Sequence, residues 1–261
     1  MRDIQKEIQD SLDAVEKEYG VEILLAAEAG SRAWGFASDD SDYDVRFIYV
    51  MKPEEYLRID MVRDVIEYRL DEVLDISGWD IRKVLAALGK GNPNVMEWIN
   101  SPVIYRKSDK WEQLNALMES YFSRKASIYH YYGTANSTYK GHLCGDTVRY
   151  KKYFYALRPL LCCRWIERYD SIPPVLFSEL LQLFDGTDEV LDAVLYANIQ
   201  ELLKRKALTG EKEENPHMPV IIDFIREELA GQKRIVSSME DDRRHDWTEL
   251  NEAFRKIVRT V

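Results

Sequence analysis

The chain has 261 residues, of which 46% are hydrophobic and 31% charged, and its formal net charge at pH 7 is −10. The length favours two compact units, and the composition excludes a largely disordered chain. The negative charge argues against non-specific wrapping of nucleic acid, which needs broad basic surfaces, although a local basic groove remains open.

The N-terminal segment lacks the apolar core of a secretory signal, and no stretch approaches the roughly 20 apolar residues of a membrane span. We therefore expect a cytoplasmic protein with no membrane partner. The three cysteines, Cys144, Cys162 and Cys163, do not form a metal-ligand spacing.

Apolar residues at helical spacing predict an N-terminal helix over residues 4–15, which Gly20 ends. A short apolar run predicts a buried strand at 21–27. A β-branched and aromatic run predicts a second strand at 43–50. The segment between them, 30–41, is rich in Gly, Ser and Asp, so we expect a loop there.

Two further strands are predicted at 61–68 and 72–76. A helix is then expected to begin with Ser77 as its N-cap, because Asp80 lies three residues on and can reach back to the free amides. The sequence Gly91-Asn92-Pro93 should end this helix before another begins.

The pattern changes near residue 108, after which strand-like runs give way to long helical patterns. We therefore predict an α+β fold with two domains. Residues 1–108 should form a catalytic α/β domain, a small mixed sheet flanked by helices, and residues 109–261 an all-α domain. The active site is expected in the cleft between them, where ligand sites often form.

The most informative segment joins Gly30-Ser31, after the first strand, to Asp42-Tyr43-Asp44 on the second. Side chains alternate along a strand, so Asp42 and Asp44 should project to the same side. Two such carboxylates can hold hard divalent cations, which in phosphoryl transfer neutralise the charge of a triphosphate. Gly30 lets the backbone approach a phosphate, and Ser31 can donate a hydroxyl to it.

Two arginines lie close to this motif. Arg46 should share a face with both aspartates, where it balances their charge or contacts a phosphate. Arg32 is predicted to bind the nucleotide as well. Ordinary ion pairing within the protein explains either arginine equally well.

The Gly-Ser turn, a spacer and Asp-x-Asp on a strand resemble the signature of the DNA polymerase β superfamily of nucleotidyltransferases. The fuller string GSRAWGF…SDYDVRFIY is more specifically similar to the predicted nucleotidyltransferases of the YcgL/RlaP type. The blocks GWDIRKVL, GNPNVMEW, SPVIY and KKYFYALRPLLCCRWI follow in order. The resemblance runs from about Glu28 to Trp165.

The resemblance implies a polymerase β-like sheet and transfer of a nucleoside monophosphate from ATP or another nucleoside triphosphate to an acceptor hydroxyl, with release of pyrophosphate. It also implies a third carboxylate that helps Asp42 and Asp44 hold two Mg²⁺ ions, with Mn²⁺ as the alternative metal. Asp75 and Asp80 compete for this role. We favour Asp75, because helix capping already explains Asp80. The acceptor stays open, with RNA and tRNA among the choices.

In the helical part, Lys151, Tyr155 and Arg158 recur on one helix face, which suits a triphosphate and a stacked base. The same pattern is common on solvated helix surfaces. Trp34 and Phe36 are expected to pack the loop rather than to contact a ligand. A catalytically silent nucleotide-binding or regulatory module on the same fold is the alternative function.

Overall fold

The computed structural model describes residues 3–38, 40–188, 190–209 and 213–261. The chain forms two compact units, and each is built from separate stretches of sequence. The first contains Met1–Ala33, Asp42–Phe122 and Arg243–Val261, and the second contains Trp34–Ser41 and Ser123–Asp242. The predicted domain boundary near residue 108 stays a prediction. A single boundary cannot be compared directly with two units that each combine separate segments of the chain.

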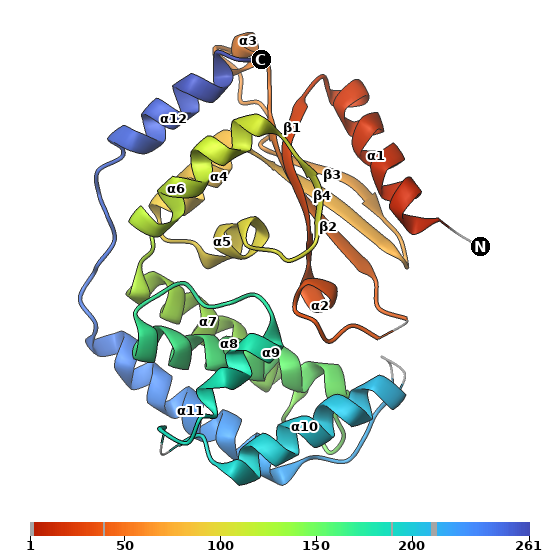
Figure 1. Cartoon of the computed structure of the whole chain (residues 1–261), viewed down its shortest axis with the longest axis vertical. Coiled ribbons are helices and arrows are strands. Elements are labelled where there is room, and N and C mark those ends of the chain that lie inside the picture. Colours follow the sequence, from red (N-terminus) through yellow and green to blue (C-terminus); the bar gives the residue numbers. More distant parts are fainter. Residues whose placement is uncertain (1–2, 39, 189, 210–212) are drawn as a thin grey trace. The chain divides into compact units, whose positions relative to one another are not determined.

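The first unit combines a sheet with helices (Figure 1). Its strands are β1 Glu22–Ala29, β2 Tyr43–Val50, β3 Val65–Leu70, β4 Leu74–Asp80 and β5 Ile104–Lys107. Its helices are α1 Ile4–Tyr19, α2 Gly30–Ala33, α3 Pro53–Tyr56, α4 Ile81–Gly89, α5 Pro93–Ile99, the 3-10 turn η1 Asp109–Trp111, α6 Glu112–Ser120 and α12 Thr248–Val258.

The five strands are ordered β3-β4-β2-β1-β5. The β2–β4 pair is parallel, and the other neighbouring pairs are antiparallel. Figure 1 shows α1 on one side of this sheet and α4, α5 and α6 on the other. The predicted α+β class with a mixed sheet is confirmed.

The sheet has two chemically different faces. On the α1 side, alternate residues of β2 and β4 are buried with apolar residues of the helix, and this core contains Ile8, Leu12, Val15, Val45, Phe47, Tyr49, Leu74 and Ile76. The residues between them on β2 and β4 point the other way. Near the start of the two strands, the side chains of Asp44, Arg46 and Asp75 are only half-buried, so this end of the second face carries polar groups.

Most elements that the sequence predicts in this unit are present. The first helix ends at Gly20, which takes a left-handed conformation with φ +64°. The second strand spans Tyr43–Val50, as predicted. The expected loop after the first strand begins instead with the single helical turn α2.

The predicted N-cap at Ser77 is wrong. Strand β4 continues through this residue, because Ser77 pairs with Arg46 of β2 on one side and Glu67 of β3 on the other. The helix begins three residues later, where the Asp80 side chain accepts a hydrogen bond of 2.8 Å from the Arg82 amide. Pairing on both edges of the strand outweighs the local capping signal.

The second unit is helical, with α7 Arg124–His142, α8 Tyr150–Tyr169, α9 Phe177–Leu180, the 3-10 turn η2 Leu181–Leu183, α10 Ala193–Leu208 and α11 Pro219–Ser238. The segment 34–41 packs into this unit. The ring of Phe36 stacks on Phe154 at 4.6 Å and meets Phe177 edge-on at 5.8 Å. None of the described helices combines the length and the apolar character that crossing a membrane requires.

Candidate active site

Gly30 and Asp44 lie against each other where β1 ends. Ala29, the last residue of β1, pairs with Asp44 of β2, so the chain leaves the sheet beside this carboxylate. Gly30 has φ +61°, and a Cβ atom there would lie 2.2 Å from Asp44 Oδ2. Only glycine therefore allows this turn to pass the carboxylate. Ser31 follows in α2 and is buried.

Asp75 is the direct neighbour of Asp44 on the sheet. The two residues are partners in the parallel pairing of β4 with β2, so their side chains leave the same face. Both carboxylates are half-buried. The fold thus brings together two acids that are separated by 31 positions in the sequence.

Arg46 bridges these two carboxylates. Its Nη2 atom donates to Asp75 Oδ2 at 2.6 Å and to Asp44 Oδ1 at 3.2 Å, and its Nη1 atom donates to the Asp75 carbonyl oxygen at 3.0 Å. A guanidinium in this position offsets the repulsion between two like charges. Of the two roles considered for Arg46, the structure contains the charge-balancing contact.

Asp42 lies just before β2 and is exposed. Its carbonyl oxygen accepts a hydrogen bond of 3.0 Å from Arg32 Nε, and the Arg32 guanidinium stacks on the Tyr43 ring at 3.7 Å. Arg32 therefore ties the end of α2 to the start of β2. These contacts fix the backbone on which the Asp-x-Asp motif is carried.

Asp80 has a different environment from Asp75. Its side chain is fully buried, and it accepts hydrogen bonds from the Tyr56 hydroxyl at 2.6 Å and from the Arg82 amide at 2.8 Å. Burial raises the pKa of the Asp80 carboxyl. Asp80 is five residues beyond Asp75 on β4, so it points to the opposite face, away from Asp44.

Glu28 is a buried acid that the sequence reasoning did not single out. Its Oε1 atom accepts a hydrogen bond of 2.8 Å from the backbone amide of Asp44, and its Oε2 atom accepts one from the Tyr105 hydroxyl. Desolvation by burial raises the pKa of the Glu28 carboxyl to about 7. The only sequence signal is an acid directly after the apolar run of residues 23–27.

Two of the three residues predicted on the helical nucleotide-binding face contact the ring of Trp34. Arg158 is buried, its Nε atom donates to the Val175 carbonyl oxygen at 3.2 Å, and its guanidinium lies 4.7 Å from the centre of the Trp34 ring. Tyr155 meets the same Trp34 ring edge-on at 5.3 Å. Lys151 is half-buried on α8. The expected packing role of Trp34 fits these contacts, and nucleotide binding by Lys151, Tyr155 and Arg158 stays a prediction.

The chemistry of the donors at the sheet suits a hard divalent cation, because carboxylate oxygens are the ligands that Mg²⁺ prefers. Among the described residues, however, no three His, Cys, Asp or Glu side chains converge as a ready-made metal site. Asp44 and Asp75 converge on a guanidinium instead. A metal at these two carboxylates would have to displace Arg46 from at least one of them.

The sequence matches the family described as "RlaP: RNA repair pathway DNA polymerase beta family" over residues 4–256. The chain belongs to this family. A relative in Bacillus subtilis (strain 168), the uncharacterized protein YcgL, is 40% identical over 259 residues, which cover 99% of this chain and 98% of that protein. The predicted membership of the YcgL/RlaP type is thereby confirmed.

A nucleotidyltransferase-like protein from Exiguobacterium sibiricum 255-15, known from a crystal structure, is also similar to this chain. The identity is 14%, the similarity covers 88% of this chain and 75% of that one, and the TM-score is 0.31. Family membership therefore rests on the sequence match, and it identifies a polymerase β-like nucleotidyltransferase.

Proposed function

We propose that this chain transfers a nucleoside monophosphate from a nucleoside triphosphate, such as ATP, to a hydroxyl group of RNA in a magnesium-dependent reaction that releases pyrophosphate. The observation that carries the proposal is the pairing of Asp44 with Asp75 beside Gly30. Membership of a family whose description names RNA repair supports RNA as the acceptor.

In this reaction the acceptor oxygen forms a bond to the α-phosphorus, the bond from that phosphorus to the bridging oxygen breaks, and pyrophosphate leaves with the electron pair. Asp42, Asp44 and Asp75 would hold Mg²⁺, or Mn²⁺ in its place. A metal held there would supply charge neutralisation on the triphosphate and would lower the pKa of the acceptor hydroxyl. Asp75 accepts the hydroxyl proton as general base.

The residues around the carboxylates have separate tasks. Gly30 lets the main chain approach a phosphate oxygen, and Ser31 offers a hydroxyl donor. Arg46 offsets the repulsion between Asp44 and Asp75, and its guanidinium would be available to a phosphate if a cation took its place at one carboxylate. Binding of the triphosphate by Lys151 and its neighbours on α8 belongs to this proposal as well.

A catalytically silent nucleotide-binding module is the second candidate. The contact that favours it is the bridge from Arg46 to both carboxylates, which offsets one of their two negative charges without a metal. Such a module would bind magnesium–nucleotide but release no pyrophosphate.

The test incubates the protein with Mg²⁺, RNA and each α-labelled triphosphate in turn, and follows pyrophosphate release and labelling of the RNA. Asp44→Asn combined with Asp75→Asn should abolish both signals while the melting temperature stays close to that of the wild type. Asp10→Asn removes an exposed carboxylate on α1 and serves as the matched control. Full turnover by the double variant would disprove the assignment.

A further inference from the structure

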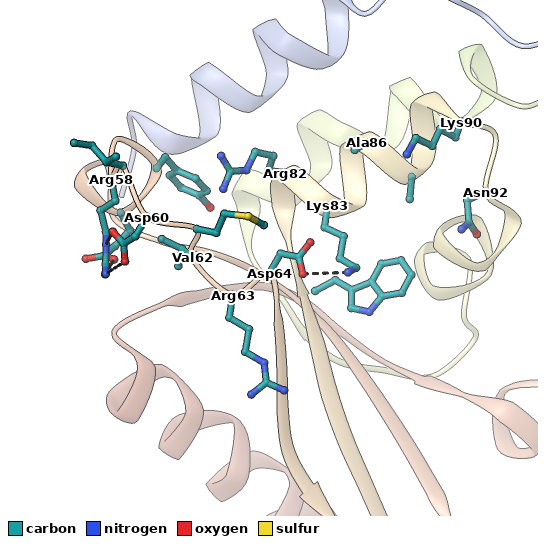
Figure 2. A pocket seen from close by; sticks show the side chains of 16 residues that line it. Arg58, Asp60, Val62, Arg63, Asp64, Arg82, Lys83, Ala86, Lys90 and Asn92 are labelled. Atoms are coloured by element: carbon teal, nitrogen blue, oxygen red, sulfur yellow. Dashed lines mark hydrogen bonds and ion pairs between the residues drawn. The ribbon is translucent and has the colours of Figure 1, made fainter.

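A second feature of the first unit is a surface pocket of about 940 Å³. It is lined by the loop 57–64 between α3 and β3, by the end of β4 and by the outer side of α4. Figure 2 shows Lys83 on α4 and Lys90 directly after the end of this helix, with Asp64 joined to Lys83. We propose that this pocket binds single-stranded RNA, the acceptor of the reaction proposed above, with the reacting end directed along β4 towards Asp75.

The charge of the lining is opposite to that of the whole chain. Five cationic side chains line the pocket, against three acidic ones: Arg58, Arg63, Arg82, Lys83 and Lys90, against Glu55, Asp60 and Asp64. The lining is thus net positive in a protein whose formal charge is −10. A local basic groove of this kind is what an acidic protein needs to hold a phosphate backbone.

The ion pairs in the pocket are of a kind that phosphates can replace. Lys83 Nζ lies 3.1 Å from Asp64 Oδ1, and the carboxylate is half-exposed. Arg58 pairs with Asp60 at 2.5 Å, again between largely exposed side chains. Exposed pairs contribute little to stability, so exchanging an acidic partner for a phosphate costs little.

Aromatic and apolar surfaces alternate with these cations. The half-buried Trp79 lines the pocket, with Lys83 Nζ 5.3 Å from its ring centre. Ile59 and Met61 line it as well and are almost fully exposed. Bases and phosphates alternate along single-stranded RNA in the same way, and the bases stack on aromatic rings while the phosphates pair with cations.

The row of residues along β4 connects the pocket with the carboxylates. Asp75, Ser77 and Trp79 are alternate residues of one strand, so they share one face, and all three are half-buried. This is the face opposite to α1. Four residues of strand span about 13 Å, a length that matches about four stacked nucleotides of one strand.

The experiment measures binding of a labelled single-stranded RNA of about 12 nucleotides by fluorescence anisotropy, without triphosphate or metal, over a range of salt concentrations. Lys83→Glu combined with Lys90→Glu should weaken RNA binding about tenfold or more at low salt. The slope of the logarithm of the binding constant against the logarithm of the salt concentration should become shallower by about 1.4, the value for the loss of two phosphate contacts. Lys90→Glu alone, at an exposed position, should give an intermediate loss with an unchanged melting temperature.

The matched control reverses the same number of charges elsewhere, with Lys17→Glu on α1 and Lys233→Glu on α11, both exposed. It should bind RNA within about twofold of the wild type, because these positions lie outside the pocket. Equal losses in both double variants, or wild-type protein that binds a protein segment there and no RNA, would overturn the inference.

This inference rests on the proposed function, but the two can fail separately. The double variant Asp44→Asn, Asp75→Asn should bind RNA as the wild type does while transferring nothing. Wild-type protein that labels an acceptor other than RNA, and binds no RNA, would overturn the pocket assignment alone. Pocket-dependent RNA binding without pyrophosphate release under any condition would instead overturn the proposed transfer reaction.

Discussion

A Cβ atom added to Gly30 would lie 2.2 Å from Oδ2 of Asp44, far inside van der Waals contact. This relationship gives the first prediction. Gly30→Ala must move the Asp44 carboxylate or the turn, in addition to straining a backbone with φ +61°. Gly20→Ala is the matched control, because Gly20 has φ +64° and nothing lies within 4 Å of its added Cβ.

We expect Gly20→Ala to cost about 1–2 kcal/mol of unfolding free energy, the strain of the left-handed backbone alone. Gly30→Ala should cost more and should also remove nucleotide transfer. Denaturant unfolding gives the stabilities, and pyrophosphate release gives the activity. If both variants were equally stable and both kept their activity, the close approach of Gly30 to the Asp44 carboxylate would be disproved.

The second prediction concerns the Arg46 guanidinium, which bridges Asp44 and Asp75. Arg46→Met leaves Asp44 and Asp75 adjacent and like-charged, so the melting temperature should fall in metal-free buffer. Mg²⁺ should then raise the melting temperature more in this variant than in the wild type, because it no longer competes with a guanidinium. Arg63→Met, which removes an exposed ion pair, is the control and should show no such gain.

The third prediction is a pH dependence of stability from Glu28. Burial raises the pKa of this carboxyl from 4.5 to about 7, so the folded protein holds a proton that the unfolded chain releases. The stabilising effect of that proton is complete below pH 4.5 and is lost as the pH rises through about 7.

Glu28→Gln should remove this dependence, because an amide can accept from the Asp44 amide and donate to the Tyr105 oxygen without a charge. The melting temperature of the variant minus that of the wild type should therefore rise between about pH 5 and about pH 7 and level off at higher pH. Scanning calorimetry at intervals across that range is the measurement. A constant difference would show that Glu28 does not titrate there.

The fourth prediction separates packing from ligand binding in the helical unit. Arg158→Lys cannot both stack on Trp34 and keep the directed hydrogen bond to the Val175 carbonyl oxygen, so it should lower stability by about 1–3 kcal/mol. Lys151→Met should cost much less stability and should raise the KM for the triphosphate if the predicted binding role holds. Thermal melts and initial rates distinguish the two effects.

Local sequence was sufficient where a pattern is repeated within one element. Strand β2 was predicted at its observed bounds, because its β-branched and aromatic residues are consecutive. Ser77 was misjudged because its strand pairs on both edges with residues that are distant in the sequence, and only the folded sheet supplies those partners. Glu28 was overlooked for a related reason, since its hydrogen-bond partner Tyr105 is 77 positions away.

The candidate site also has parts that the sequence predicts and parts that only the folded sheet reveals. The pattern of residues 30–44 predicted the acids and the glycine, but not the contact from Arg46 to Asp75, which depends on the register between β2 and β4. The sequence predicted that Trp34 and Phe36 pack, but not that their partners lie on α8 and α9, because a short polar segment with two aromatic rings indicates only a loop.

The segment 34–41 gives the protein an unusual genetic constraint. Cleaving the gene after position 122 would yield an N-terminal product without α12, and a C-terminal product deprived of the rings that stack on Phe154 and Arg158. Neither product would be a whole folding unit. Chimaeras that join the first half of this chain to the second half of a relative should therefore fold less well than either parent protein.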